Sequence, residues 1–205
     1  MQLSYALQDQ EGTNGIYNND NWFQYFGPQN PHSVLNVSGV VDLPWKFQAS
    51  FISSYASRAP FQPVIPGVDL TGSGIDGFPL PGLGDSLFNR GLGKADLVKL
   101  VSQYNQTFPT VNLPASYDFG RNFNSQDLRL TKLFKWRERY ELQAFAEAFN
   151  IFNFSNLTYD LSSSGGFGSS NNLLNPGFGQ PTGRAGGTFG TGGPRAFQLG
   201  SRFSF

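Results

Sequence analysis

Polar and apolar residues alternate one by one over the last twelve residues of the chain, 194–205. Side chains of a β-strand point to opposite faces in turn, so this alternation predicts a strand with one apolar and one polar face. The apolar face carries Arg195, Phe197, Leu199, Ser201, Phe203 and Phe205, and the polar face carries Ala196, Gln198, Gly200, Arg202 and Ser204. The strand ends on an aromatic residue.

The same alternation recurs along the chain and predicts five further strands. They cover residues 1–10, 33–43, 46–57, 122–134 and 139–152. Only Pro44 and Trp45 separate the strands at 33–43 and 46–57. A turn at 135–138 separates the strands at 122–134 and 139–152. The sequence therefore predicts an all-β, antiparallel fold of about six strands that contains two tight hairpins.

The other connections are long, covering residues 11–32, 58–121 and 153–193. Tight turns at one end of a sheet and long loops at the other are typical of outer-membrane β-barrels, which have short periplasmic turns and extended extracellular loops. A loop as long as 58–121 is rare in a compact soluble domain. Within it, residues 94–106 place Leu97, Leu100, Val101 and Tyr104 at helical spacing, which predicts a short amphipathic helix packed on the loop.

Each tight turn contains a tryptophan with basic neighbours: Trp45 precedes Lys46, and Trp136 lies between Lys135 and Arg137. An indole beside cations suits a membrane–water boundary, where the ring is half buried and its N–H stays hydrated. We therefore predict Trp45 and Trp136 to be membrane-interface aromatics. The alternative is that each tryptophan anchors the core of a soluble sheet.

Three residues interrupt the alternation. Lys132 falls on the apolar side of its strand, while Phe145 and Phe149 fall on the polar side. A lysine near a strand end can extend its ammonium group to the membrane interface. Arg129, Glu141 and Glu147 on the polar side are interpreted as wall charges that hold a plug or guide a solute.

Composition excludes several classes of function. Lysine plus arginine and aspartate plus glutamate each number 14, so no basic surface for nucleic acid is expected. The chain has no cysteine, one histidine and no G-x-S-x-G motif, which leaves no basis for a thiolate metal site or a nucleophilic triad. No apolar run reaches the roughly 18 residues of a spanning helix, so any membrane span must consist of strands. We expect no enzyme, no catalytic residue, no cofactor and no resident metal.

Weaker motifs do not change this expectation. Residues 72–77 fit G-x-G-x-x-G, but no strand precedes them and the prolines at 79 and 81 oppose a following helix. Glu141 and Glu147 lie too far apart along one strand to act as a carboxylate pair. Aspartates in the longest loop match no known calcium loop, and calcium binding there stays open: Asp69, Asp76, Asp85 and Asp96.

Several segments, taken in order, resemble a known family. They are residues 26–32 (FGPQNPH), 42–45 (DLPW), 127–132 (DLRLTK), 147–153 (EAFNIFN), 178–183 (FGQPTG) and the terminal strand. Together they resemble the carboxyl-terminal barrel of TonB-dependent receptors, with the Oar-like receptors that carry a carboxypeptidase-regulatory-like domain as the nearest branch. The spacing of Gly200, Phe203 and Phe205 resembles the carboxyl-terminal assembly signal of bacterial outer-membrane barrels.

The resemblance implies a barrel of about 22 strands around an internal plug, which uses the TonB complex to take up a scarce solute across the outer membrane. The expected partners are outer-membrane lipid, the barrel-insertion machinery, the TonB complex through a missing amino-terminal part, and an unidentified solute. Residues 1–205 are expected to be the carboxyl-terminal part of that barrel, and their start, which lacks a secretory signal, to be the distal part of a longer reading frame. The alternative is a soluble or surface-attached β-rich protein that binds ligands through its Gly-rich loops.

Overall fold

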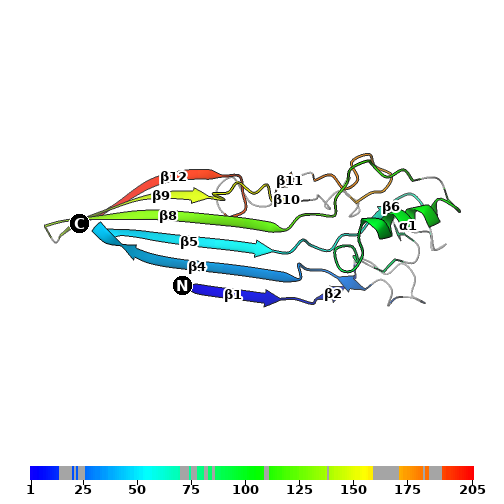
Figure 1. The fold of residues 1–205 in the computed structure, drawn as a ribbon, viewed down its shortest axis with the longest axis horizontal. Coiled ribbons are helices and arrows are strands. Elements are labelled where there is room, and N and C mark those ends of the chain that lie inside the picture. Colours follow the sequence, from blue (N-terminus) through cyan, green and yellow to red (C-terminus); the bar gives the residue numbers. More distant parts are fainter. Residues whose placement is uncertain are drawn as a thin grey trace.

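One antiparallel sheet of six strands, in the order β1-β4-β5-β8-β9-β12, dominates the fold (Figure 1). The structure is a computed structural model that describes residues 1–13, 20, 22, 26–69, 74, 78–80, 83–84, 86–108, 111–137, 139–158, 171–181, 183–184 and 191–205. The strands are β1 (Gln2–Leu7), β4 (Ser33–Leu43), β5 (Phe47–Ala56), β8 (Phe123–Trp136), β9 (Tyr140–Phe149) and β12 (Ala196–Ser204). All six predicted strands are present, which confirms the all-β, antiparallel prediction.

Both hairpin turns use left-handed backbone. Between β4 and β5, the 3₁₀ turn η2 (Pro44–Lys46) holds Trp45 and Lys46 at a φ of 61° each. Positive φ at consecutive residues lets a short turn follow the right-handed twist of its strands. Between β8 and β9 the chain reverses after Arg137, whose φ is 52°. The predicted turn at 135–138 is wrong at its start, because Trp136 still pairs with Tyr140 in the sheet.

The long connections gather at the other end of the sheet (Figure 1). They contain helix α1 (Lys94–Tyr104), which confirms the helix predicted at 94–106. They also contain three two-residue ladders that the sequence did not predict: β2 (Glu11–Gly12) with β3 (Gly27–Pro28), β6 (Val64–Ile65) with β7 (Phe78–Pro79), and β10 (Leu157–Thr158) with β11 (Gly183–Arg184). Tight turns and long loops thus lie at opposite ends, as predicted.

The buried apolar core lies in these connections and not in the sheet. We call it the loop core: Phe61, Ile65, Leu80, Leu83, Phe88, Leu97, Val101, Tyr104, Val111, Phe119, Leu173 and Phe178. It joins the connection between β5 and β8 to the connection between β9 and β12. Among the described residues, no apolar side chain of the six long strands is buried. The sheet therefore acquires no hydrophobic core from the part of the chain that the structure describes.

Candidate functional site

The strand register places apolar residues on one continuous face of the sheet. Leu199 lies opposite Ala146, Ala146 opposite Leu130, Leu130 opposite Ala49, and Ala49 opposite Val41. Because paired residues share a face and side chains alternate, this row and the residues in phase with it define one surface, the apolar face. The intervening residues define the polar face.

Charge separates almost completely between these two faces. Seven charged side chains of the six strands lie on the polar face: Asp42, Asp127, Arg129, Lys135, Glu141, Glu147 and Arg202. Within the bounds of the six strands, the apolar face carries a single charged residue, Lys132, and no carboxylate; Arg195, which is in phase with this face, lies just before β12 at the loop end. None of the apolar side chains of this face is buried, and Leu199 is 82% exposed. A contiguous apolar surface of this kind marks contact with a membrane or with another protein.

Lys132 directs its charge toward the tight turns. Its ammonium group donates a hydrogen bond to the backbone carbonyl of Trp45 and lies 4.1 Å from the ring centroid of Phe47. It also lies 5.7 Å from the ring of Phe134. The ammonium group of Lys132 thus lies beside the turn that contains Trp45, between the rings of two apolar-face residues.

Aromatic rings cluster at the same end of the sheet. Trp136 lies opposite Tyr140, the Tyr140 ring stacks on Phe203 with centroids 6.0 Å apart, and Phe205 lies 6.2 Å from Phe203. Trp45 and Trp136 are 82% and 74% exposed. Neither tryptophan is covered by the described residues, so neither anchors a core that those residues form.

The three residues of the predicted assembly signal lie on different faces. Phe203 and Phe205 belong to the apolar face, and both are exposed. Gly200 belongs to the polar face, where it lies opposite Phe145. A Cβ atom at position 200 would come within 2.3 Å of the Phe145 ring, so the aromatic ring occupies the space that a side chain would fill. Gly200 thus has a packing role in addition to any part in a signal.

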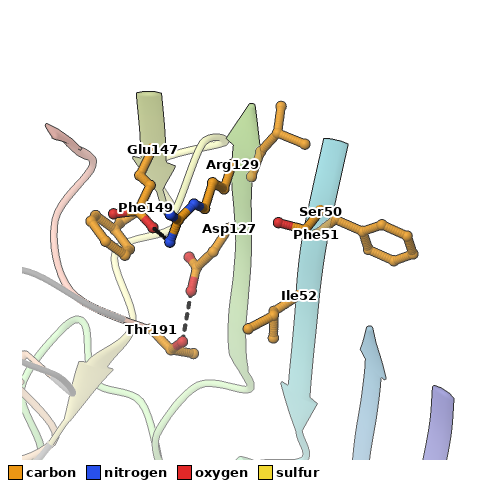
Figure 2. A pocket seen from close by; sticks show the side chains of 9 residues that line it. Ser50, Phe51, Ile52, Asp127, Arg129, Glu147, Phe149 and Thr191 are labelled. Carbon is orange, nitrogen blue, oxygen red and sulfur yellow. Dashed lines mark hydrogen bonds and ion pairs between the residues drawn. The ribbon is translucent and has the colours of Figure 1, made fainter. Parts of the chain in front are cut away.

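A hollow of ≈ 320 Å³ opens on the polar face beneath the loops (Figure 2). On one side, Arg129 donates to Glu147 at 3.1 Å and lies over the Phe145 ring at 4.0 Å. On the other side, the carboxylate of Asp127 accepts a 2.6 Å hydrogen bond from the Thr191 hydroxyl. The other lining residues are Ser50, Phe51, Ile52, Leu128 and Phe149. Both hydrogen-bond donors and acceptors therefore line this space.

Two asparagines fasten the chain just before β12 to the ends of β8 and β9. The fully buried Asn150 donates from its amide to the carbonyls of Phe154 and Gly193, both at 2.7 Å. Asn156 donates to the carbonyls of Asn124 at 2.6 Å and Gly192 at 3.0 Å. We call Asn150 and Asn156 the asparagine clamp.

The asparagine clamp depends on properties that are particular to asparagine. Asn150 and Asn156 have φ values of 45° and 40°, a left-handed conformation that asparagine tolerates better than most residues. Their amides then satisfy backbone groups that would otherwise be buried without partners. Neither asparagine was predicted as a functional residue, because no local pattern specifies a positive φ or a contact with residues 192–193.

Hydrogen bonds also tie separate loops to one another. Arg90 donates to the carbonyl of Asn30 at 2.7 Å and to that of Arg58 at 3.2 Å. Burial, and then the positive charge of Arg58, lowers the pKa of Arg90 from its usual value. Burial raises the pKa values of Tyr104 and Tyr117, which pack in or against the loop core. The loops thus form a packed assembly at the end of the sheet.

The remaining residues singled out in the sequence have local roles or lie outside the described residues. Asp96 accepts a hydrogen bond from the Gly93 amide at 2.8 Å and caps α1, and Asp69 accepts one from Gly74 at 2.6 Å. Asp76, Asp85 and most of residues 72–77 lie outside the described residues. Within the described ranges, no group of three or more His, Asp or Glu side chains is placed to hold a metal ion.

Among the described residues, no helix has the length and apolar character needed to cross a membrane. Comparison of this chain with protein-family models, with curated proteins and with solved structures gave no match. Its function therefore has to be inferred from its own residues and their arrangement.

Proposed function

We propose that this chain forms part of the wall of a bacterial outer-membrane β-barrel, the carboxyl-terminal part of a TonB-dependent receptor. The observation that carries the proposal is the separation of charge across the sheet. Within the six strands, seven charged side chains lie on one face, while Lys132 is the single charged side chain on the other. In this proposal the apolar face contacts lipid and the polar face lines the barrel interior.

The energetics of a lipid-facing strand explain this pattern. A Lys or Arg on the lipid face of a barrel costs about 2–4 kcal/mol at the bilayer midplane and little near the interface. Lys132 extends its ammonium group to the turn at Trp45, away from the middle of the sheet. Water imposes no such penalty, so a sheet with both faces in water has no reason to exclude charge from one of them.

The unpaired edges of the sheet also support the barrel proposal. Within the described residues, β1 pairs only with β4 and β12 pairs only with β9. Unpaired backbone N–H and C=O groups in hydrocarbon cost several kcal/mol each. Both edges therefore need further strands, and a barrel larger than six strands supplies them.

The receptor assignment goes beyond the barrel and rests on the family resemblance of the sequence. The loops at one end would be extracellular and make first contact with a solute, and the turns at Trp45 and Trp136 would be periplasmic. The hollow beside Arg129 and Asp127 would line the path around a plug that belongs to another part of the receptor. Transport would draw on the TonB complex through that other part.

A soluble or surface-attached β-rich ligand-binding protein is the second candidate. One observation favours it: the loops form a folded unit that includes a hollow of ≈ 390 Å³ lined by Val111, Asn112, Pro114 and residues 173–176. In this candidate, the apolar face would remain exposed to water, with no lipid to cover it.

The test follows the native protein in a fractionated bacterium that expresses it. An antibody against residues 58–121 is used to find the protein, measure its intact mass and compare its gel mobility before and after boiling in SDS. We expect a species several times heavier than 22.5 kDa, in the outer-membrane fraction, with heat-dependent mobility. A 22.5 kDa species would contradict the receptor assignment. A soluble protein without a mobility shift would contradict the barrel proposal itself.

A further inference from the structure

Three arginines come together where the polar face passes into the loops. Arg58 lies two residues after Ala56, the last residue of β5, and Arg121 lies two residues before Phe123, the first residue of β8. Ala56 pairs with Phe123 on the polar face. Continuing this register by two residues places Arg58 opposite Arg121, in phase with the polar face. The amide of Arg58 also donates to the Asn122 side chain at 2.9 Å, which ties the two segments together beyond the sheet.

Arg90, from the middle of the same connection, is held beside this pair. Its guanidinium group donates to the carbonyl of Arg58 at 3.2 Å. The preceding residue, Asn89, donates from its side-chain amide to the carbonyls of Ala59, at 2.9 Å, and Phe119, and so bridges the segments that carry the other two arginines. Burial, and next the charge of Arg58, lowers the pKa of Arg90, so the two charges are close enough to repel. We call these three residues the arginine cluster.

No carboxylate of the described residues forms an ion pair with the arginine cluster. No acidic residue lies within two positions of any of the three arginines along the chain. The nearest in sequence, Asp118, accepts a hydrogen bond from the backbone amide that follows it, and Asp127 on β8 already accepts three hydrogen bonds. Asp76, Asp85 and Asp160 lie outside the described residues. Since neighbouring positive charges repel, an anion between them would stabilise the cluster.

We infer that the arginine cluster binds a carboxylate or phosphate group of the solute, which makes the solute an anion. Guanidinium groups match both of these groups with two parallel hydrogen bonds. Arg90 is half-buried and fixed by backbone carbonyls, whereas Arg58 and Arg121 are exposed and free to turn toward a ligand. The role of the anion as a solute rests on the proposed function, which makes the loop end of the polar face the mouth of the barrel. Anion binding itself needs no membrane.

The test uses the native protein, extracted from membranes in an uncharged detergent. Calorimetric titration measures the binding of citrate, of pyrophosphate and, as an uncharged probe, of maltotriose. We expect the wild type to bind at least one of the two anions and not maltotriose, and the tighter anion tells a carboxylate site from a phosphate site. The double variant Arg58→Gln, Arg121→Gln should bind that anion about tenfold more weakly for each arginine lost, because each removes a hydrogen bond between charged groups.

Two controls accompany this variant. Arg137→Gln with Arg139→Gln removes the same charge at the tight-turn end of the sheet and should leave anion binding unchanged. Arg58→Lys with Arg121→Lys keeps the charge but loses the paired hydrogen bonds, and should bind with intermediate affinity. The thermal unfolding transition of each variant shows whether it has folded.

The outcomes separate the anion site from the barrel. Anion binding that is weakened only by the glutamine variant at the loop end supports the site. Binding of neither anion, or equal affinity in the two glutamine variants, overturns the site and leaves the barrel proposal intact. A protein that stays soluble without detergent overturns the barrel and with it the role of the anion as a transported solute, while the titration still decides whether the arginine cluster binds anions.

Discussion

The aromatic ring of Phe145 occupies the space that a side chain at Gly200 would fill, with its Cζ atom 2.3 Å from the position of a Cβ there. The same ring carries the guanidinium of Arg129 at 4.0 Å, and Arg129 pairs with Glu147. The absence of a side chain at Gly200 thus leaves room for Phe145 and Arg129 to stack on the polar face of β8, β9 and β12. Coverage of a strand glycine by a cross-strand aromatic ring is a known means of fixing strand register.

Replacing Gly200 with alanine should displace the Phe145 ring and destabilise the sheet by about 1–3 kcal/mol, the usual cost of overpacking. Denaturant unfolding of the detergent-solubilised protein measures this loss. The double variant Gly200→Ala, Phe145→Leu should recover much of it, because a smaller side chain leaves room for the new methyl group. If the double variant is as impaired as Gly200→Ala alone, the glycine acts through something other than Phe145.

The predicted assembly signal can be tested separately from this packing. Phe205→Ser should strongly reduce the amount of assembled protein in the outer membrane, because the terminal aromatic would be read by the insertion machinery. Phe197→Ser is the matched control, since Phe197 lies on the same face of the same strand and is also exposed. Equal effects of the two variants, measured by heat-dependent gel mobility, would argue against a terminal signal.

The asparagine clamp should determine how firmly the chain before β12 is held. Asn156→Ala removes the donor to the Gly192 carbonyl and leaves buried groups unpaired, at a cost of about 1–3 kcal/mol. We expect faster hydrogen exchange at the Gly192 amide, which donates to Ser125. Asn112→Ala, at an exposed loop asparagine, should leave that exchange rate unchanged. Unaltered exchange in Asn156→Ala would show that the clamp is dispensable.

The loop core should unfold independently of the sheet, because it contains no residue of the six long strands. Leu97→Ala empties a fully buried position on α1 and should destabilise the loops by about 2–5 kcal/mol. Val98→Ala, at the exposed neighbouring position, should change stability by less than about 0.5 kcal/mol. Hydrogen exchange resolved by residue is the measurement. Simultaneous loss of protection in β8 and β9 would contradict this independence.

The six strands and α1 could be predicted from the sequence because each follows a regular period, two residues in β12 and about 3.6 in α1. The loop core could not be predicted. Phe61 and Phe178 stack edge to face, with centroids 6.0 Å apart, yet they come from different connections in Gly- and Pro-rich sequence without any period. The clamp at Asn150 also depends on positive φ and long-range contacts, which no local pattern specifies.

The tight-turn aromatics were predicted from their basic neighbours, and the structure places Trp136 and Tyr140 side by side at the end of the apolar face. The hollow of ≈ 420 Å³ that Trp136, Arg137, Tyr140 and Phe203 line was not predicted. It requires β12 to pair with β9, although the long connection between these two strands separates them in the sequence. Sequence patterns of single strands carry no information about such neighbours.

The central claim is that the apolar face contacts lipid, and Leu199→Arg tests it most directly beside Gln198→Arg as its control. Leu199 is 82% exposed and lies near the middle of β12, and Gln198 is the adjacent residue on the polar face. If lipid covers Leu199, its replacement by arginine costs about 2–4 kcal/mol and lowers the assembled protein in the outer membrane, whereas Gln198→Arg is tolerated. Equal assembly of both variants would contradict the claim, because arginine at an exposed position in water carries no such penalty.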